Sequence, residues 1–183
     1  MAIINIITLG CAKNTVDSEN LAGYLQKAGH WIIFDENDRK ADVVIINTCG
    51  FIGDAKEESI DTILQFVDLN KRKRNKQKII VCGCLVERYK QDLHKEIPEV
   101  DHFFGVHEWD KILNILLTPM HRELYDERLQ STPQHYAYLK IAAGCARSCS
   151  YCAIPLIRGK HGSRPMGSLL EEAKKLVHTG VHA

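Results

Sequence analysis

The feature that most constrains the fold is a regular alternation of short apolar runs with amphipathic helical patterns over residues 1–118. Such alternation predicts an α/β domain with a parallel sheet, because a crossover helix normally joins one parallel strand to the next. The candidate strands are IINIITL, WIIF, VVIIN, KIIVCG and HFFG. The candidate helices begin near Asp17 or Ser18 and at Asp54, and cover 86–93 and 108–117.

Local signals predict how two of these helices begin and which side of one is buried. Asp17 or Ser18 can cap a first turn, and Asp54 with Glu57 three residues later resembles a capping box. In the helix that Asp54 opens, apolar residues recur at helical spacing, which indicates a face turned to the core. That face comprises Ile60, Ile63, Leu64 and Val67.

The character of the sequence changes after residue 118. Residues 119–137 contain prolines and many charges with little periodicity, which predicts an inter-domain linker. Residues 138–183 offer a strand in YLKIAAG, a cysteine-containing loop and a final helix, with Gly180 suited to follow the helix end. The apolar face of that helix comprises Leu169, Leu170, Ala173, Leu176 and Val177. One strand and one helix cannot bury a core, so either the chain is a fragment with a truncated second domain, which we expect, or its last ~45 residues pack on something else.

Composition narrows the functional classes. The net charge of +1 produces no global field that favours nucleic acid or a membrane surface. The start, MAIINIITLG, lacks a basic segment and cleavage site, and no run approaches the roughly 18 apolar residues of a membrane span. We therefore expect a cytoplasmic protein, in which seven cysteines indicate metal or redox chemistry rather than disulfides. The basic run 71–76 lies at a predicted helix end, where cations are favoured, so we assign it no nucleic-acid role.

Three cysteines lie within eight residues in the stretch CARSCSYC: Cys145, Cys149 and Cys152, which we call the loop set. An iron–sulfur cluster takes one cysteine thiolate per iron, so three thiolates on a four-iron cube leave one iron open to a substrate. Zinc, with His161 as a fourth tetrahedral ligand, and free thiols are the alternatives. Tyr151 favours the cluster, because three cysteines with an aromatic before the last resemble the radical S-adenosylmethionine signature.

Three other cysteines each follow a predicted strand: Cys11, Cys49 and Cys84, which we call the strand-end set. The carboxyl ends of parallel strands share one rim of a sheet, where ligands bind, so we expect these thiols to meet there. A second open cluster is one interpretation of the strand-end set. The other is that its cysteines are small apolar core residues. Cys82 lies within a predicted strand, and we assign it to packing.

Several stretches together resemble the radical S-adenosylmethionine methylthiotransferases. LGCAKNTVDSE, INTCGFIGDAKEESIDTI, CGCLVERY and PEVDHFFG are similar to the N-terminal domain of that family, and HYAYLKIAAGCARSCSYCAIPLIRGKHGSRP is similar to the start of its radical domain. The transfer-RNA branch typically has GCQMN and NTCSVR at the first two cysteines. Here Lys13-Asn14 and NTCGFI match the branch that modifies an aspartate of ribosomal protein S-twelve.

The resemblance implies an enzyme that adds a methylthio group to the aspartate β-carbon, with S-adenosylmethionine and two 4Fe–4S clusters as cofactors. The loop set would hold the cluster that binds S-adenosylmethionine, with Tyr151, Arg158 and Arg164 nearby, and the strand-end set would hold the auxiliary cluster. The implied partners are the ribosomal protein and a one-electron donor such as a flavodoxin, with nucleic acid met only through the ribosome.

Two departures and two alternatives accompany the resemblance. Gly162 stands where a larger residue is expected, and most of the barrel and the TRAM domain are absent, so we expect little or no turnover by this chain. Transfer RNA is the alternative substrate. A zinc-stabilised binding module is the alternative of a different class.

Overall fold

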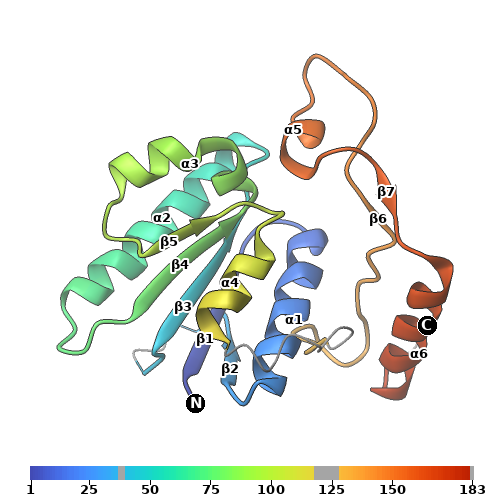
Figure 1. Ribbon diagram of the computed structural model, residues 1–183, viewed down its shortest axis with the longest axis horizontal. Coiled ribbons are helices and arrows are strands. Elements are labelled where there is room, and N and C mark those ends of the chain that lie inside the picture. The colour runs from blue at the N-terminus through green and yellow to red at the C-terminus, as the bar shows by residue number, and fades with distance from the viewer. Residues whose placement is uncertain (37–39, 118–127, 182–183) are drawn as a thin grey trace.

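The computed structural model describes residues 1–36, 40–117 and 128–181. Its larger part is a five-stranded sheet in the order β2-β1-β3-β4-β5, with every neighbouring pair parallel (Figure 1). The strands are β1 (Ile3–Thr8), β2 (Trp31–Phe34), β3 (Val43–Thr48), β4 (Lys78–Gly83) and β5 (His102–Phe104). The predicted α/β class with a parallel sheet is therefore confirmed.

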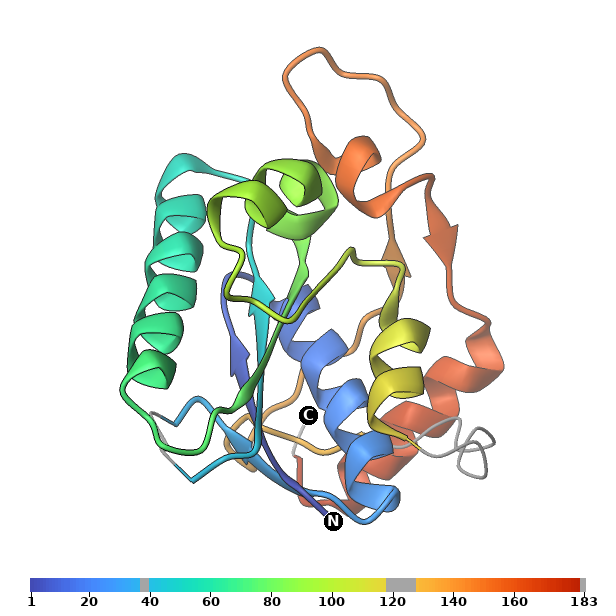
Figure 2. The same ribbon diagram turned by 60° about the vertical axis from the view of Figure 1, so that its left-hand side comes forward.

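Helices cover both faces of this sheet (Figure 2). Side chains alternate between the faces, as the pleat requires: Ile7 and Ile46 join one core cluster, while Ile6 and Ile45 join the other. The first cluster includes residues of α2 (Gly53–Lys71) and α3 (Cys84–Glu96). The second includes residues of α1 (Ala12–Lys27) and α4 (Trp109–Leu116).

The part after residue 137 is small and open. It contains β6 (Ala142–Ala143), α5 (Ile154–Arg158), β7 (Gly162–Ser163) and α6 (Met166–His178), and its two short strands are antiparallel. The strand expected over YLKIAAG is thus confined to two residues. Gly180 follows the end of α6 with φ +99°, as predicted, and the Val181 amide donates to the Leu176 carbonyl (3.3 Å). No residue of α6 is fully buried: of its predicted apolar face, Leu169, Ala173 and Leu176 are partly buried, while Leu170 and Val177 are exposed.

Two helices begin differently from what the sequence predicts. α1 begins at Ala12, not near Asp17, because Gly10 turns the chain with φ +91° directly after β1. α2 begins at Gly53, and no side chain caps it, so the predicted capping box is wrong. The N-cap residue is Cys11 in α1 and Ile52 in α2, and neither helix has a side-chain capping hydrogen bond.

The buried face of α2 is also shifted from the predicted one. Ile63 and Val67 are buried, as expected, but Ile60 and Leu64 are 37% and 43% exposed. Phe66 and Ser59 take their places in the interior. The reason for Ser59 is a polar contact with the strand-end set, which is described below.

The segment predicted as a linker lies partly outside the described residues, which omit 118–127. Residues 128–137 form no helix or strand. They are nevertheless attached to α1, since the Leu129 amide donates to the Glu19 carbonyl (3.0 Å) and the Ser131 amide to the Glu19 carboxylate (2.7 Å). This attachment brings the second part of the chain alongside α1.

Candidate metal centre

The strand-end set lies at the carboxyl edge of β1, β3 and β4, which are neighbours in the sheet. Cys11 precedes α1, Cys49 follows β3, and Cys84 is the first residue of α3. Cys49 and Cys84 are buried, at 8% and 7% exposure, while Cys11 is exposed. In this strand order β2 lies on one side of β1 and β3 on the other, so the direction in which strands are added to the sheet reverses there, and ligands bind at that point in open α/β sheets. The topology alone therefore places the three thiols at a ligand-binding edge.

Two glycines allow the backbone to approach these thiols closely. A Cβ on Gly10 would lie 2.9 Å from the Cys49 sulfur, and a Cβ on Gly83 would lie 2.6 Å from the Thr48 carbonyl oxygen. Both glycines have positive φ, +91° and +102°, a conformation that side-chain-bearing residues rarely adopt. The glycines thus let neighbouring strands end in a tight group around the strand-end set.

Buried polar side chains fix the loops that carry the thiols. The Asn14 amide donates to the carbonyls of Leu9 (2.8 Å) and Thr48 (3.1 Å), which ties the end of β1 to the end of β3. The Ser59 hydroxyl accepts from the Cys49 amide (3.0 Å) and lies 2.9 Å from the Cys49 carbonyl. Because these groups are buried and paired, they hold the Cys49 backbone in one conformation.

Cys84 has a cation beside its sulfur. The Arg158 Nη2 atom lies 3.4 Å from the Cys84 Sγ, and the Asn14 Oδ1 atom lies 3.8 Å from it. Burial raises the pKa of the Cys84 thiol, Arg158 acts against that rise, and Cys49 and Cys11 add to it. Burial alone would lower the pKa of the Arg158 guanidinium, but Asp17 and Cys84 bring it above its ordinary value. The thiols of the strand-end set are therefore close enough to affect one another electrostatically.

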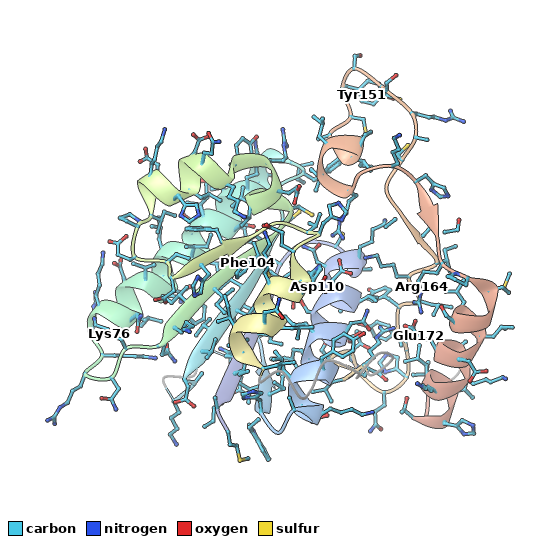
Figure 3. All side chains as sticks on the ribbon, in the orientation of Figure 1. Lys76, Phe104, Asp110, Tyr151, Arg164 and Glu172 are labelled. Atoms are coloured by element: carbon cyan, nitrogen blue, oxygen red, sulfur yellow. The ribbon has the colours of Figure 1, made fainter. Side chains whose placement is uncertain are left out.

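The loop set is more open to solvent. Cys145 and Cys152 are partly buried and Cys149 is exposed. Two backbone hydrogen bonds shape the loop: Cys145 donates to Gly159 (3.0 Å) and Cys152 donates to Cys149 (3.1 Å). Tyr151 is 91% exposed and lies at the tip of the loop, away from the sheet (Figure 3).

The described residues hold no group of three or more His, Cys, Asp or Glu close enough to bind a single metal ion. His161, the residue considered as a zinc ligand, has its Nε2 atom 3.2 Å from the Ser163 hydroxyl. An iron–sulfur cluster differs from a single-ion site because each thiolate binds a different iron.

The structure also gives the surroundings of the other residues considered in the sequence analysis. Arg164 pairs with Glu172 of α6 (Figure 3), so its charge is directed at a carboxylate and not at the loop set. Cys82 is fully buried in the core beside α1, and burial raises the pKa of its thiol. In the basic run, Lys71 pairs with Glu99 (3.0 Å), and Lys76 donates to the carbonyls of Asn70 and Lys71.

The model of the protein family described as "Uncharacterized protein family UPF0004" matches residues 3–105, more than half of the chain. The chain belongs to the UPF0004 family. The UPF0004 region contains all five parallel strands and the strand-end set, and it ends before the loop set. The strand-end set therefore lies within the part of the chain that the family model matches.

Curated relatives extend the similarity beyond the UPF0004 region. The chain is 52% identical over 97% of its length to the "Ribosomal protein uS12 methylthiotransferase RimO" of Bacteroides thetaiotaomicron. It is 53% identical to the protein of that name from Aquifex aeolicus and 51% identical to the one from Christiangramia forsetii, again over 97% of the chain. The chain spans 41%, 39% and 39% of these three relatives.

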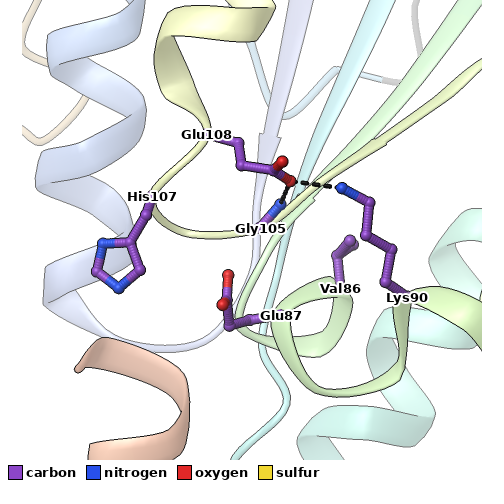
Figure 4. Close-up of a pocket in the computed structure, with 6 residues that line it drawn as sticks. All are labelled: Val86, Glu87, Lys90, Gly105, His107 and Glu108. Carbon is purple, nitrogen blue, oxygen red and sulfur yellow. Dashed lines mark hydrogen bonds and ion pairs between the residues drawn. The ribbon is translucent and has the colours of Figure 1, made fainter.

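A separate pocket of about 310 Å³ lies between α3 and the loop after β5 (Figure 4). Glu108 accepts hydrogen bonds there from Lys90 and from the Gly105 amide (2.8 Å), while Glu87 accepts one from the Val106 amide (2.9 Å). Its charged groups are therefore engaged with one another and with the backbone.

Among the described residues, no helix has the length and apolar character needed to cross a membrane.

Sequence reasoning identified the cysteines but missed the residues that organise them. Asn14 binds the carbonyls of Leu9 and Thr48. Ser59 binds the backbone of Cys49, and Asp17 binds Arg158. Asn14 carries a faint signal, since it follows Cys11 by three residues and lies on the first turn of α1. Ser59 and Asp17 carry none, because their partners are distant in the sequence or are backbone groups.

Proposed function

We propose that this chain is part of a radical S-adenosylmethionine methylthiotransferase that adds a methylthio group to the β-carbon of an aspartate in ribosomal protein S-twelve (uS12). The observation that carries the proposal is 52% identity over 97% of the chain to a protein named for that activity. The edge of the parallel sheet supports it, because it gathers three thiols and a guanidinium where this fold class binds ligands.

The strand-end set fits an auxiliary iron–sulfur cluster. Its donors are thiols, the ligand type that such clusters use, and two of the three are buried away from water. Gly10 and Gly83 let the backbone pack closely around them, where a Cβ would clash, and Arg158 offers positive charge to an anionic centre. The loop set, Cys145, Cys149 and Cys152, would hold the second cluster together with S-adenosylmethionine.

The cofactors supply one-electron reduction of the sulfonium and the sulfur to be transferred; the protein supplies binding and positioning. Asn14 and Ser59 fix the two loops that present Cys11 and Cys49. Arg158 joins the segment after the loop set to the strand-end set, so it fixes the position of this segment relative to the strand-end set. Tyr151 is exposed at the loop tip, so its ring would be accessible to S-adenosylmethionine bound at the loop set.

The proposed partners follow from the same chemistry. A one-electron donor such as a flavodoxin would reduce the cluster of the loop set, and the ribosomal protein would be the substrate. Nucleic acid would be met only through the ribosome, and two cations of the basic run, Lys71 and Lys76, are engaged with the chain's own groups. All seven cysteines are free thiols, in keeping with the cytoplasm as the place of action.

Separate incubations with the two candidate substrates test the activity. The full-length protein, with both clusters reconstituted without oxygen, is incubated with S-adenosylmethionine, a reductant and either ribosomal protein S-twelve or transfer RNA. We expect mass spectrometry to find one methylthio group on an aspartate of the ribosomal protein. A mass gain confined to transfer RNA would assign the protein to the nucleic-acid branch and reject the proposal.

Iron and acid-labile sulfide analysis tests the cofactor assignment independently of activity. We expect Cys84→Ala and Cys149→Ala each to lose about half of the iron and sulfide, because each removes a ligand of a different cluster. Cys82→Ala is the matched control, since its thiol is buried in the core beside α1, and it should keep the full content. Zinc in place of iron and sulfide would exclude clusters at both sets.

A further inference from the structure

Arg158 comes from one part of the chain and reaches the thiols of the other. It is the last residue of α5, the helix that directly follows the loop set. Figures 1 and 2 both show α5 lying beside the N-terminal end of α3, and the contact is apolar: Ile157 and Ala153 pack on Cys84 and Val106. Ile157 is 2% exposed, so the helix is seated firmly against the edge that carries Cys84.

The guanidinium of Arg158 is held at both ends. Its Nη1 donates to the Asp17 Oδ2 atom (2.7 Å), and its Nη2 donates to the Asn14 Oδ1 atom while lying 3.4 Å from the Cys84 sulfur. The side chain is only 10% exposed. Asp17 is itself fixed by Lys140, which binds its other oxygen. Such a fork of donors is pre-organised, so the charge stays at the sulfur without a further loss of freedom.

We propose that Arg158 is a positioning residue that sets the reduction potential of the centre held by Cys11, Cys49 and Cys84. This inference rests on the proposed function, because it needs a cluster at the strand-end set. Hydrogen bonds to ligand sulfur and nearby charge are the means by which proteins tune iron–sulfur potentials. A guanidinium against Cys84 stabilises the more negative, reduced state, and the potential is therefore higher than it is without it.

The origin of Arg158 gives this contact a second consequence. The segment that follows the loop set supplies the charge, so the strand-end centre has its working potential only when α5 is seated on α3. A purely structural anchor would behave differently: its loss would lower stability or iron content and leave the potential of the remaining clusters unchanged.

The test isolates the strand-end centre in the full chain. Cys145→Ala, Cys149→Ala and Cys152→Ala are combined so that one cluster remains, and its midpoint potential is measured by a redox titration followed by electron paramagnetic resonance. We expect Arg158→Gln to shift that potential to a more negative value and Arg158→Lys to restore most of it, because lysine keeps the charge. Lys160→Gln is the matched control: it removes an exposed positive charge two residues away and should leave the potential unchanged.

The outcomes separate the two proposals. A cluster with an unchanged potential in Arg158→Gln overturns the role of Arg158 and leaves the proposed function intact. Should Arg158→Gln retain no iron, the comparison passes to Arg158→Met, which keeps a long unbranched side chain without the charge and should show the same negative shift; an unchanged potential there overturns the role equally. A parent without any iron–sulfur signal rejects the cluster at the strand-end set, and the role of Arg158 with it.

Discussion

The carboxylate of Glu19 is fully buried on α1 and is bound by Arg128, which lies 109 residues later in the chain. The Arg128 Nε atom donates to it at 2.7 Å, and the Ser131 amide and hydroxyl donate to its other oxygen at 2.7 and 2.8 Å. Arg128 also contacts Glu172 of α6 (2.8 Å). One buried carboxylate thus fixes the segment that joins the parallel sheet to the second part of the chain.

We expect Glu19→Gln to lower the free energy of unfolding by about 1–3 kcal/mol, because the buried donors of Arg128 and Ser131 lose a charged acceptor, while Glu172 still compensates part of the Arg128 charge. Urea denaturation followed by circular dichroism measures this loss. Glu171→Gln is the control, since Glu171 pairs with Lys174 on the exposed side of α6 and should change stability by less than about 1 kcal/mol. Equal effects of the two substitutions would contradict the anchoring role of Glu19.

Gly83→Ala should disrupt the strand-end set. A Cβ at this position would lie 2.5 Å from the Asn47 Oδ1 atom, and the backbone conformation, with φ +102° and ψ −159°, costs a residue with a side chain about 1–3 kcal/mol more. We expect lower stability in urea and loss of iron from this set after reconstitution. Gly167→Ala, where no atom lies within 4 Å of the added carbon, should be neutral or stabilising by about 0.4–1 kcal/mol and should keep its iron.

Ser59→Ala should loosen the loop of Cys49. The hydroxyl is buried and bonded to both the amide and the carbonyl of Cys49, so its loss leaves the amide unpaired at a cost of about 1–3 kcal/mol. Thermal unfolding compared with Thr62→Ala measures this, because the Thr62 hydroxyl makes a similar contact within the same helix on its exposed side. A change no larger than that of the control would mean that Ser59 does not hold Cys49.

Acid should weaken the contact between α3 and the loop after β5 through Glu108. Hydrogen bonds from Lys111, Lys90 and the Gly105 amide lower the pKa of Glu108 from 4.5 to about 2. A carboxyl whose pKa is lower in the folded state contributes stability above pH 4.5, and that contribution disappears as the pH falls toward 2. Glu108→Gln should therefore be less stable than the parent at pH 6, and the difference should shrink on acidification.

Unfolding measured at several pH values between 6 and 2 tests the role of Glu108. Glu57→Gln on the exposed side of α2 is the control, because no ion pair or hydrogen bond is recorded for its carboxylate in the part of the chain that is described. A stability difference for Glu108→Gln that stays constant across this range would contradict the assignment.

The strands could be predicted from the sequence because continuous runs such as VVIINT are buried on both faces of a parallel sheet. The helix starts could not. Asp17, Ser18 and Glu19 resemble capping residues, yet their side chains bind Arg158, Asn47 and Arg128 from distant parts of the chain. A local rule describes only the turn that a residue occupies, and these side chains are committed to tertiary contacts.

The candidate site shows the same division. The rule for parallel sheets places Cys11, Cys49 and Cys84 at one edge, so their meeting followed from the order of apolar runs. The partner of Cys84 did not follow, because Arg158 lies 74 residues away and no periodicity relates them. Arg158 was expected near the cluster of the loop set, but in the structure it contacts Cys84 of the strand-end set.

The wide spacing of the strand-end thiols has a consequence for the order of events during maturation. The sulfurs of Cys11, Cys49 and Cys84 come together only once β1, β3 and β4 are aligned, so a cofactor that requires all of them can be delivered only to an already folded sheet. A compact motif, in contrast, can capture its metal while the chain is still unstructured. A cluster at this edge would therefore be acquired by the finished sheet and not by the nascent chain.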